Sequence, residues 1–524
     1  MQGIGQQSVQ LVKLHLQQMD YYGAWQTFRR IEMTDEARKD TLMNWLKSGY
    51  ELYHFQFDHL FSTLSELYEE EWISHEQFAL AWDHWDHLIH HQGITMDFLL
   101  DSLQDAAHHM ELYLEIENYL AFLTRLYRFR ELLILYLYLV AGRGDLVNQY
   151  QPGRAPDQLD QLEELYLTRV LNSHYGVYMF LQSKQLIEVI RLRNHSLIGH
   201  GRVGATNTSI WQMYEGKWYQ NNRLSVQAFM NDMRILFQDL GVEWSDNPYR
   251  ILMQSMLKAL DTATAQRPEW TVQLPDEVVF RENVNQYRYQ ALLNQLAHHQ
   301  LPTKLQQSLE CGRSLLLGTM SVEQCQVMKH LLEKYAEAVS GPSLHDLLIP
   351  LAEGKQTSFI NYLYAQIEVY DRQHDYGELM IRVYRLMEEL MIYFLGYDVN
   401  STTLQLQPRT NAKPRVIVKS HTFSGLMETL QRAAEVSPHH DFYGFTKESW
   451  WNGVAEVHRH SIVGHGIEAI TKEHIEDALH LTLPELRDKL VQVMRLVGIS
   501  LKPNYFDQLN GLILWKYRVL QVNE

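Results

Sequence analysis

One helical signature occurs twice in this chain, and it restricts the possible folds more than any other feature. The segment TRLYRFRELLILYLY (124–138) aligns with IRVYRLMEELMIYFL (381–395) at an offset of 257 residues. The polar residues that the alignment pairs are Arg125 with Arg382, Tyr127 with Tyr384, Arg128 with Arg385 and Glu131 with Glu388. A repeat of this kind indicates two copies of one helical unit within a single chain.

Helical periodicity extends over most of the sequence. Apolar residues recur at three- and four-residue spacing over 8–92, 96–140, 158–200 and 344–395. Ser74, with Gln77 three residues later, has the spacing of a capping box. Glycine and proline number only 27 and 13 in 524 residues, and 397–419 is the best candidate for local extended or loop structure. We therefore expect an all-α fold.

The length of the chain exceeds one ordinary domain. Loop-like segments and the repeat predict an N-terminal helical region (1–94), a first repeated domain (95–240), a helical connector (241–342) and a second repeated domain (343–524). The expected architecture is two helical bundles from an internal duplication, with additional N-terminal and connecting helices.

A second pair of matching segments contains the polar chemistry. RLRNHSLIGHG (191–201) and EVHRHSIVGHG (456–466) both contain His-Ser, two apolar residues and Gly-His-Gly. Arg193 and His200 are seven residues apart, which would place them on one face of a helix. An arginine suits a phosphate, and a histidine exchanges a proton near neutral pH. That pair is sufficient for RNA cleavage by the RNA's own 2′-hydroxyl, although a glycine-terminated helix end is the structural alternative.

The Arg…His spacing on a helical chain resembles the HEPN ribonucleases. The upstream R-x-Y-R-x-x-E helix is similar to that of the HEPN domains in the ancillary ribonucleases of type III CRISPR systems. The resemblance covers roughly 96–205 and 355–470, so the two repeated domains are predicted to be HEPN-like. It implies a metal-independent endoribonuclease that cleaves single-stranded RNA, leaves 2′,3′-cyclic phosphate ends and acts in prokaryotic antiviral defence.

The resemblance also implies roles for individual residues. Two HEPN domains would pair so that both motifs line one cleft, here as an intramolecular pseudo-dimer, with a homodimer of chains as a further possibility. The catalytic residues would be Arg193, His200, Arg459 and His465. Supporting or RNA-positioning roles would fall to Asn194, His195, His458, His460, Glu131 and Glu388.

The sequence departs from the family pattern in two ways. When the His-Ser segments are superposed, Arg193 falls on His458 and Arg459 falls on Asn194, so the second arginine is displaced by one residue. This displacement corresponds to about 100° around an ideal helix. The alternating strand–helix pattern of a cyclic-oligoadenylate sensor domain is also absent from the sequence, so activation by such a ligand does not carry over.

Composition sets further limits. The net charge of −17 argues against broad, sequence-independent coating of nucleic acid. The only cysteines, Cys311 and Cys325, are expected to be buried free thiols. No secretion signal is seen, and the longest apolar run (132–142) is too short to cross a bilayer, so a cytoplasmic location is expected.

Two other polar groups could have chemical roles. Asp83, His87 and His91 share a helical spacing, with His84 adjacent, and could bind a metal, although a solvated face explains them as well. Trp450 and Trp451 could stack on bases, although core packing is the alternative. We expect no metal and no cofactor.

Two functional alternatives remain open. The chain could be a non-catalytic HEPN-derived scaffold that binds RNA or protein, which the displaced arginine and the acidic charge favour. It could also be the toxin of a toxin–antitoxin pair. The expected partners are single-stranded RNA and, additionally, a CRISPR effector or an antitoxin, with no membrane.

Overall fold

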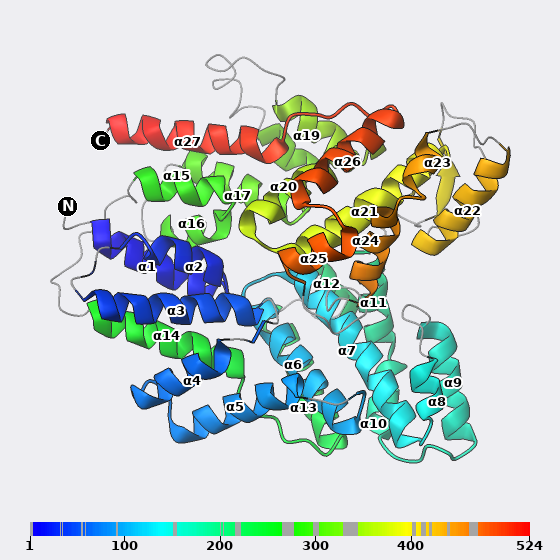
Figure 1. Ribbon diagram of the computed structural model, residues 1–524, viewed down its shortest axis with the longest axis horizontal. Helices are drawn as coiled ribbons and strands as arrows, with labels where there is room; N and C mark the ends of the chain where they lie inside the picture. The colour runs from blue at the N-terminus through cyan, green and yellow to red at the C-terminus, as the bar shows by residue number, and fades with distance from the viewer. Residues whose placement is uncertain are drawn as a thin grey trace. The chain divides into compact units, whose positions relative to one another are not determined.

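The computed structural model describes all of the chain apart from a set of short segments. The segments outside the description are residues 1–3, 32, 34, 54–55, 58, 91–92, 150–154, 200, 203, 215–221, 265–276, 297–302, 328–343, 401–404, 410–415, 419–421, 437–440, 461–469 and 524. Most of the described residues are helical and very few are in strands, which confirms the all-α fold class (Figure 1). None of the described helices is long and apolar enough to cross a membrane.

The helices of the first half of the chain are α1 (Ile4–Gln17), α2 (Tyr21–Phe28), α3 (Glu36–Tyr53), α4 (Leu60–Glu69), α5 (His75–Ile89), α6 (Met96–Glu115), α7 (Tyr119–Val140), α8 (Gly144–Asn148), α9 (Ala155–Leu167), α10 (Tyr175–Leu181), α11 (Lys184–His195), α12 (Asn207–Tyr214), α13 (Asn222–Asp239) and α14 (Pro248–Thr264). The start of α5 has the predicted capping box, in which Ser74 and Gln77 bond to each other's backbone N–H groups.

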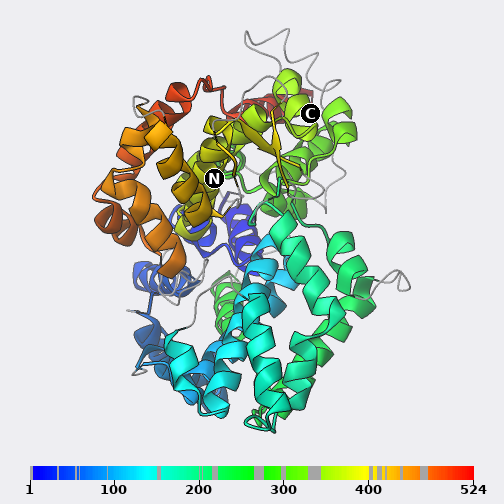
Figure 2. The ribbon, with the colours of Figure 1, turned by 90° about the vertical axis from the view of Figure 1, so that its right-hand side faces the viewer.

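The elements of the second half are α15 (Glu277–Asn285), α16 (Tyr289–Leu296), α17 (Thr303–Leu316), α19 (Leu344–Ala352), α20 (Gln356–Gln373), α21 (Tyr376–Phe394), β1 (Tyr397–Val399), β2 (Leu406–Pro408), α22 (Phe423–Val436), α23 (Phe442–Phe445), α24 (Ser449–His460), α25 (Lys472–Leu479), α26 (Leu483–Leu496) and α27 (Tyr505–Asn523). The strands β1 and β2 pair antiparallel within the segment predicted as extended or loop structure (Figure 2).

The chain forms two compact units. Unit 1 contains residues 1–194 and 205–269, and unit 2 contains residues 195–204 and 270–524. The division follows the two halves of the sequence except for 195–204, which lies in the first half but belongs to unit 2. The four sequence-defined regions are therefore distributed over two units, each with its own core.

The repeated signature lies on α7 and α21, and each is the second arm of a helical hairpin. α6 packs against α7, and α20 packs against α21. Each turn contains a residue in the left-handed conformation, Glu117 or His374, both with φ 57°. The next residue, Asn118 or Asp375, accepts a hydrogen bond from the backbone N–H three residues on and so caps the helix. Both pairs are separated by 257 residues, so the repeat includes the turn.

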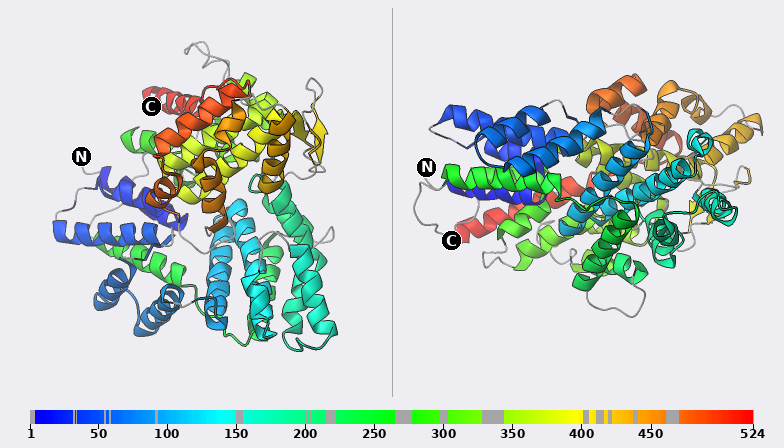
Figure 3. Two further views of the ribbon diagram at one scale, coloured as in Figure 1. Left: turned by 45° about the vertical axis from the view of Figure 1, so that its right-hand side comes forward. Right: turned by 90° about the horizontal axis from the view of Figure 1, so that it is seen from below.

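Helices before and after each hairpin also repeat. In unit 1, α2 packs against α1 and α3, and α14 also packs against α1 and α3. In unit 2, α16 packs against α15 and α17, and α27 also packs against α15 and α17 (Figures 1 and 3). A Cβ on Gly49 would come within 2.4 Å of the Tyr21 ring, and a Cβ on Gly312 within 2.8 Å of the Tyr289 ring. The duplication thus includes helices that were predicted as an N-terminal region and a connector.

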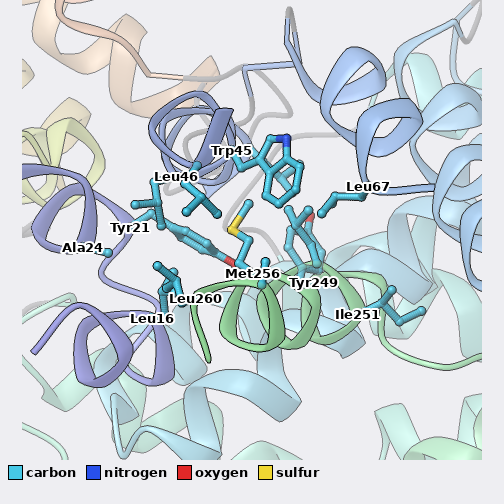
Figure 4. Close-up of a cluster of buried hydrophobic side chains, with 14 of the residues drawn as sticks. Leu16, Tyr21, Ala24, Trp45, Leu46, Leu67, Tyr249, Ile251, Met256 and Leu260 are labelled. Carbon is cyan, nitrogen blue, oxygen red and sulfur yellow. The ribbon is translucent and has the colours of Figure 1, made fainter. Parts of the chain in front are cut away.

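Buried side chains from α1 to α5 and α14 form a core in unit 1 (Figure 4). Trp45 is fully buried there, and its indole N–H donates to Glu66 at 2.8 Å. The Tyr249 hydroxyl donates to Asp105 at 2.6 Å. These large rings contribute apolar area to the core while their polar atoms remain hydrogen-bonded, as buried polar groups require.

Candidate functional site

The two polar clusters begin at the ends of equivalent helices. The bounds of α24, Ser449–His460, are those of α11, Lys184–His195, displaced by 265 residues. The helices that follow, α12 and α25, match at the same offset. The last helical turn of α11 and that of α24 therefore occupy the same place in the two halves.

The equivalence extends to side-chain contacts at positions 193 and 458. The guanidinium carbon of Arg193 lies 4.4 Å from the ring centroid of Tyr127 on α7. The His458 ring stacks on Tyr384 of α21, with centroids 4.1 Å apart and planes inclined by 10°. Because Tyr127 and Tyr384 are paired in the repeat, Arg193 and His458 are structural counterparts. This agrees with the superposition of the two sequence clusters.

Asn194 and Arg459 occupy the next position along the helix. Arg193 donates from Nη1 to Oδ1 of Asn194 at 3.3 Å, so the side chains at these two positions meet in unit 1. Arg459 belongs to α24, but its side chain and that of His460 lie outside the described residues. The displaced arginine is therefore placed by its backbone position, as the counterpart of Asn194.

The prediction that Arg193 and His200 share a helical face is wrong, because α11 ends at His195. The backbone N–H groups of Gly199 and Gly201 both donate to the carbonyl of Ser196 at 3.0 Å, which turns the chain. A Cβ on Gly201 would lie 1.6 Å from the His195 carbonyl oxygen. Only glycine fits against the helix end so closely.

Two of the predicted catalytic residues fall outside the description. His200 and His465 are both in segments that the structure does not describe. Among their neighbours, His195 is the last residue of α11 and is partly buried. The catalytic assignments of these histidines stay predictions.

The segment that contains the first cluster is anchored in unit 2 by Arg202. Its Nη2 lies 3.1 Å from Glu389 and 2.5 Å from Asp398, and its Nη1 donates to the Gly354 carbonyl at 3.0 Å. Burial alone would raise the pKa of Glu389, but Arg202 and Arg385 outweigh burial and hold this pKa below its usual value. No local sequence pattern points to Arg202, because its carboxylate partners are 187 and 196 residues away.

The glutamates expected to support the site are buried in ion pairs. Glu131 accepts from Arg128 at 3.5 Å, and Glu388 accepts from Arg385 at 3.0 Å. Both glutamates are only 1% exposed, so each carboxylate lies in the protein interior and pairs with an arginine of its own helix. Near this pair in unit 1, burial raises the pKa of Tyr127 to about 12, with Glu131 adding to the rise and Arg193 opposing it.

The histidines considered as a metal site make ordinary structural contacts. His84 is buried against Asp105 at 3.3 Å, whereas His87 is exposed and lies 3.7 Å from Asp101. His91 is outside the described residues, and none of those described belongs to a cluster able to hold a metal.

The other sequence candidates are interior residues. Trp450 and Trp451 are 2% and 0% exposed, so they are core residues and do not provide a surface for stacking on bases. Cys311 and Cys325 are buried free thiols, as expected.

The site residues that sequence reasoning missed are the ring partners. Tyr127 and Tyr384 were paired by the repeat, but only the structure shows that they receive the polar side chains of α11 and α24. No family model matches the chain, and no match is found among curated proteins or solved structures.

Proposed function

We propose that the chain is a metal-independent endoribonuclease that cleaves single-stranded RNA at a composite site built from both clusters. The observation that supports this most is the repeated end of α11 and α24. Each helix places a flat polar side chain on a tyrosine of the repeated signature and then leads into Gly-His-Gly. Two copies of an arginine and a histidine provide the groups that phosphoryl transfer needs.

In the proposed reaction the RNA 2′-hydroxyl attacks the adjacent phosphorus and the bond to the 5′-oxygen breaks. One neutral histidine, His200 or His465, accepts the 2′-hydroxyl proton, and the other, protonated, donates a proton to the leaving 5′-oxygen. Arg193 and Arg459 stabilise the negative charge on the phosphorus oxygens. The product is a 2′,3′-cyclic phosphate and a free 5′-hydroxyl.

The displaced arginine is compatible with this scheme. In the first half, Arg193 and Asn194 touch, so side chains from these two positions reach one region. An arginine at the Asn194-equivalent position, Arg459, would supply charge to the corresponding region of the second half. A prokaryotic antiviral setting, a cytoplasmic location and an effector or antitoxin partner belong to the same proposal and rest on the motifs alone.

The test is cleavage of a fluorogenic single-stranded RNA in excess EDTA. His200→Ala and His465→Ala should each lower the rate by about 10²–10⁴-fold, as is typical when a general acid or base is lost. His75→Ala, at an exposed histidine on α5, is the matched control and should cleave normally. Undiminished cleavage by the His200→Ala/His465→Ala double variant would reject the proposal.

A non-catalytic scaffold is the second candidate, and one observation favours it. Gly201 packs on the end of α11, which is a structural reason for a glycine beside the histidine. A scaffold would bind the same RNA, in filter binding, without cleaving it in either EDTA or Mg²⁺. Cyclic-phosphate products from the wild-type chain, absent from the double variant, would exclude this candidate.

A further inference from the structure

A pocket of about 740 Å³ opens in unit 1 between α10, α11, α12 and α13. Its volume lies in the range of ligand-binding pockets. Met179 and Ile235 line it and are 65% and 60% exposed, so the apolar surface extends to the pocket's rim. Phe180, Ser183, Gln185 and Asp232 also line the pocket.

The duplication identifies the same place in unit 2. GVYMFLQSKQ (176–185) aligns with DFYGFTKESW (441–450) at the offset of 265 that relates α11 to α24. α13 and α26 end at residues 257 apart, and each leads to a glycine with positive φ, Gly241 and Gly498. The counterparts of Phe180, Ser183, Gln185 and Asp232 are therefore Phe445, Glu448, Trp450 and Lys489.

In unit 2, Glu448, Trp450 and Lys489 are linked by polar contacts, and Phe445 lies beside the lysine. Lys489 Nζ lies 2.7 Å from Glu448 Oε2 and 5.5 Å from the centroid of the Phe445 ring. The Trp450 indole N–H donates to the same Glu448 oxygen at 3.0 Å, and Trp450 is 2% exposed. An aromatic ring and a cation, joined by a carboxylate, thus occupy the position that is open in unit 1.

Unit 1 has the same wall but lacks this filling. The tryptophan is replaced by the exposed Gln185 and the lysine by the acidic Asp232, which accepts a hydrogen bond from the Tyr214 hydroxyl. The charge at the lysine position is therefore reversed. An occupant that restores the arrangement of unit 2 must bring an aromatic ring and a positive charge.

We propose that this pocket binds a segment of a partner protein that carries an aromatic side chain next to a lysine or arginine. Asp232 would pair with the basic group, and Phe180 would contact the occupant as Phe445 contacts Lys489. Asp232 and the chain's net charge of −17 disfavour an RNA phosphate here. The exposed Met179 and Ile235 extend the apolar surface for a polypeptide. The inference is independent of the proposed nuclease activity.

The test uses two blocked dipeptides, acetyl-Trp-Lys-amide and acetyl-Trp-Glu-amide, with the full chain labelled on its methionine methyl groups. The Met179 signal is assigned by its loss in Met179→Leu. Titration with the lysine peptide should shift this signal saturably, and the glutamate peptide should bind several times more weakly. Asp232→Asn should bind both peptides with similar affinity, because the pocket's charge is removed.

A blocking variant completes the experiment. Ser183→Glu, Gln185→Trp and Asp232→Lys together recreate the filling of unit 2 and should abolish the Met179 shift. If the triple variant has a lower melting temperature than the wild type, Gln185→Trp alone, at an exposed position, serves as the blocking variant. Absence of a saturable Met179 shift, equal affinity of the wild type for both peptides, or wild-type binding by a folded blocking variant would overturn the proposal.

Discussion

At the scale of single residues, Tyr127 and Tyr384 explain how the two clusters can differ and still be equivalent. Each ring receives a flat, polar side chain, the guanidinium of Arg193 or the imidazole of His458. Both groups stack on an aromatic face, so exchanging them preserves the packing. Histidine at position 458 lacks the fixed positive charge of Arg193, and in the second half that charge is on the next residue, Arg459.

Arg193→His should therefore separate packing from catalysis. Histidine in this position can stack on Tyr127 as His458 does on Tyr384, so thermal unfolding should change little. The rate of RNA cleavage should fall by about 10²-fold, because the first half loses its fixed charge. Arg193→Ala, the comparison, should lose the rate and also about 0.5–2 kcal/mol of stability with the cation–π contact. A wild-type rate for Arg193→His would contradict this account.

A buried histidine cluster in unit 1 predicts acid sensitivity. Asp105 lies 3.3 Å from His84 and 3.5 Å from His109. Burial lowers the pKa values of His108 and His109 from 6.5 to about 3. Burial opposes ionisation of Asp105, but His109, His84 and Tyr249 outweigh it and hold its pKa below the usual value.

The unfolded chain therefore binds more protons than the folded one as the pH falls from 6.5 towards 3, and stability should decline across that window. His109→Gln should reduce the decline, since glutamine does not titrate. Urea unfolding of both proteins at pH 7 and pH 4.5 measures the difference. An equal loss of stability in the variant and the wild type would contradict the assignment.

At the scale of elements, the end of α11 decides the geometry of the first cluster. The turn brings Gly201 onto the His195 carbonyl, where a methyl group has no space. Gly201→Ala should open this turn and lower RNA cleavage, while circular dichroism should show the helices intact. Gly144→Ala, where a Cβ would meet nothing within 4 Å, is the control and should be neutral. Equal activity of the two variants would contradict a positioning role for the turn.

The same turn shows where sequence reasoning stops. The helical class and the capping box at Ser74 follow from periodicity and local hydrogen bonding, which are properties of nearby residues. The correspondence of α7 with α21 follows from the aligned repeat. α11 ends at His195, where Gly201, six residues later, folds back onto the helix end. The helical periodicity of the sequence continues beyond His195, so it predicted a longer helix. The burial of Trp450 and the anchoring of Arg202 depend on long-range packing, which no local pattern records.

At the scale of the whole molecule, two halves share one helical plan and differ in a few features. The matched features are the hairpins, the capped turns, the glycine–tyrosine contacts and the ends of α11 and α24. Among the described residues, the second half alone has the strands β1 and β2, and the pocket of unit 1 is filled at its counterpart.

The anchoring of 195–204 in unit 2 predicts a large stability effect for one arginine. Arg202→Ala would leave Asp398 without this arginine and Glu389 with Arg385 alone, which should cost about 3 kcal/mol. Arg191→Ala breaks an exposed pair with Glu188 and should cost at most about 1 kcal/mol. Urea unfolding monitored by tryptophan fluorescence compares the two. Equal midpoints would show that this segment is not held by Arg202.

In the proposed ribonuclease, the two clusters are copies of one site whose second arginine has moved by one residue. The most direct test of this claim measures RNA cleavage in excess EDTA by three proteins: wild type, Arg459→Ala, and a double variant with His458→Arg and Arg459→Asn. The double variant restores the arginine–asparagine order of the first cluster, with the arginine at the position that stacks on Tyr384. We predict that Arg459→Ala lowers the rate by about 10²-fold and that the double variant cleaves close to the wild-type rate. A wild-type rate for Arg459→Ala, or a double variant as slow as Arg459→Ala, would contradict it.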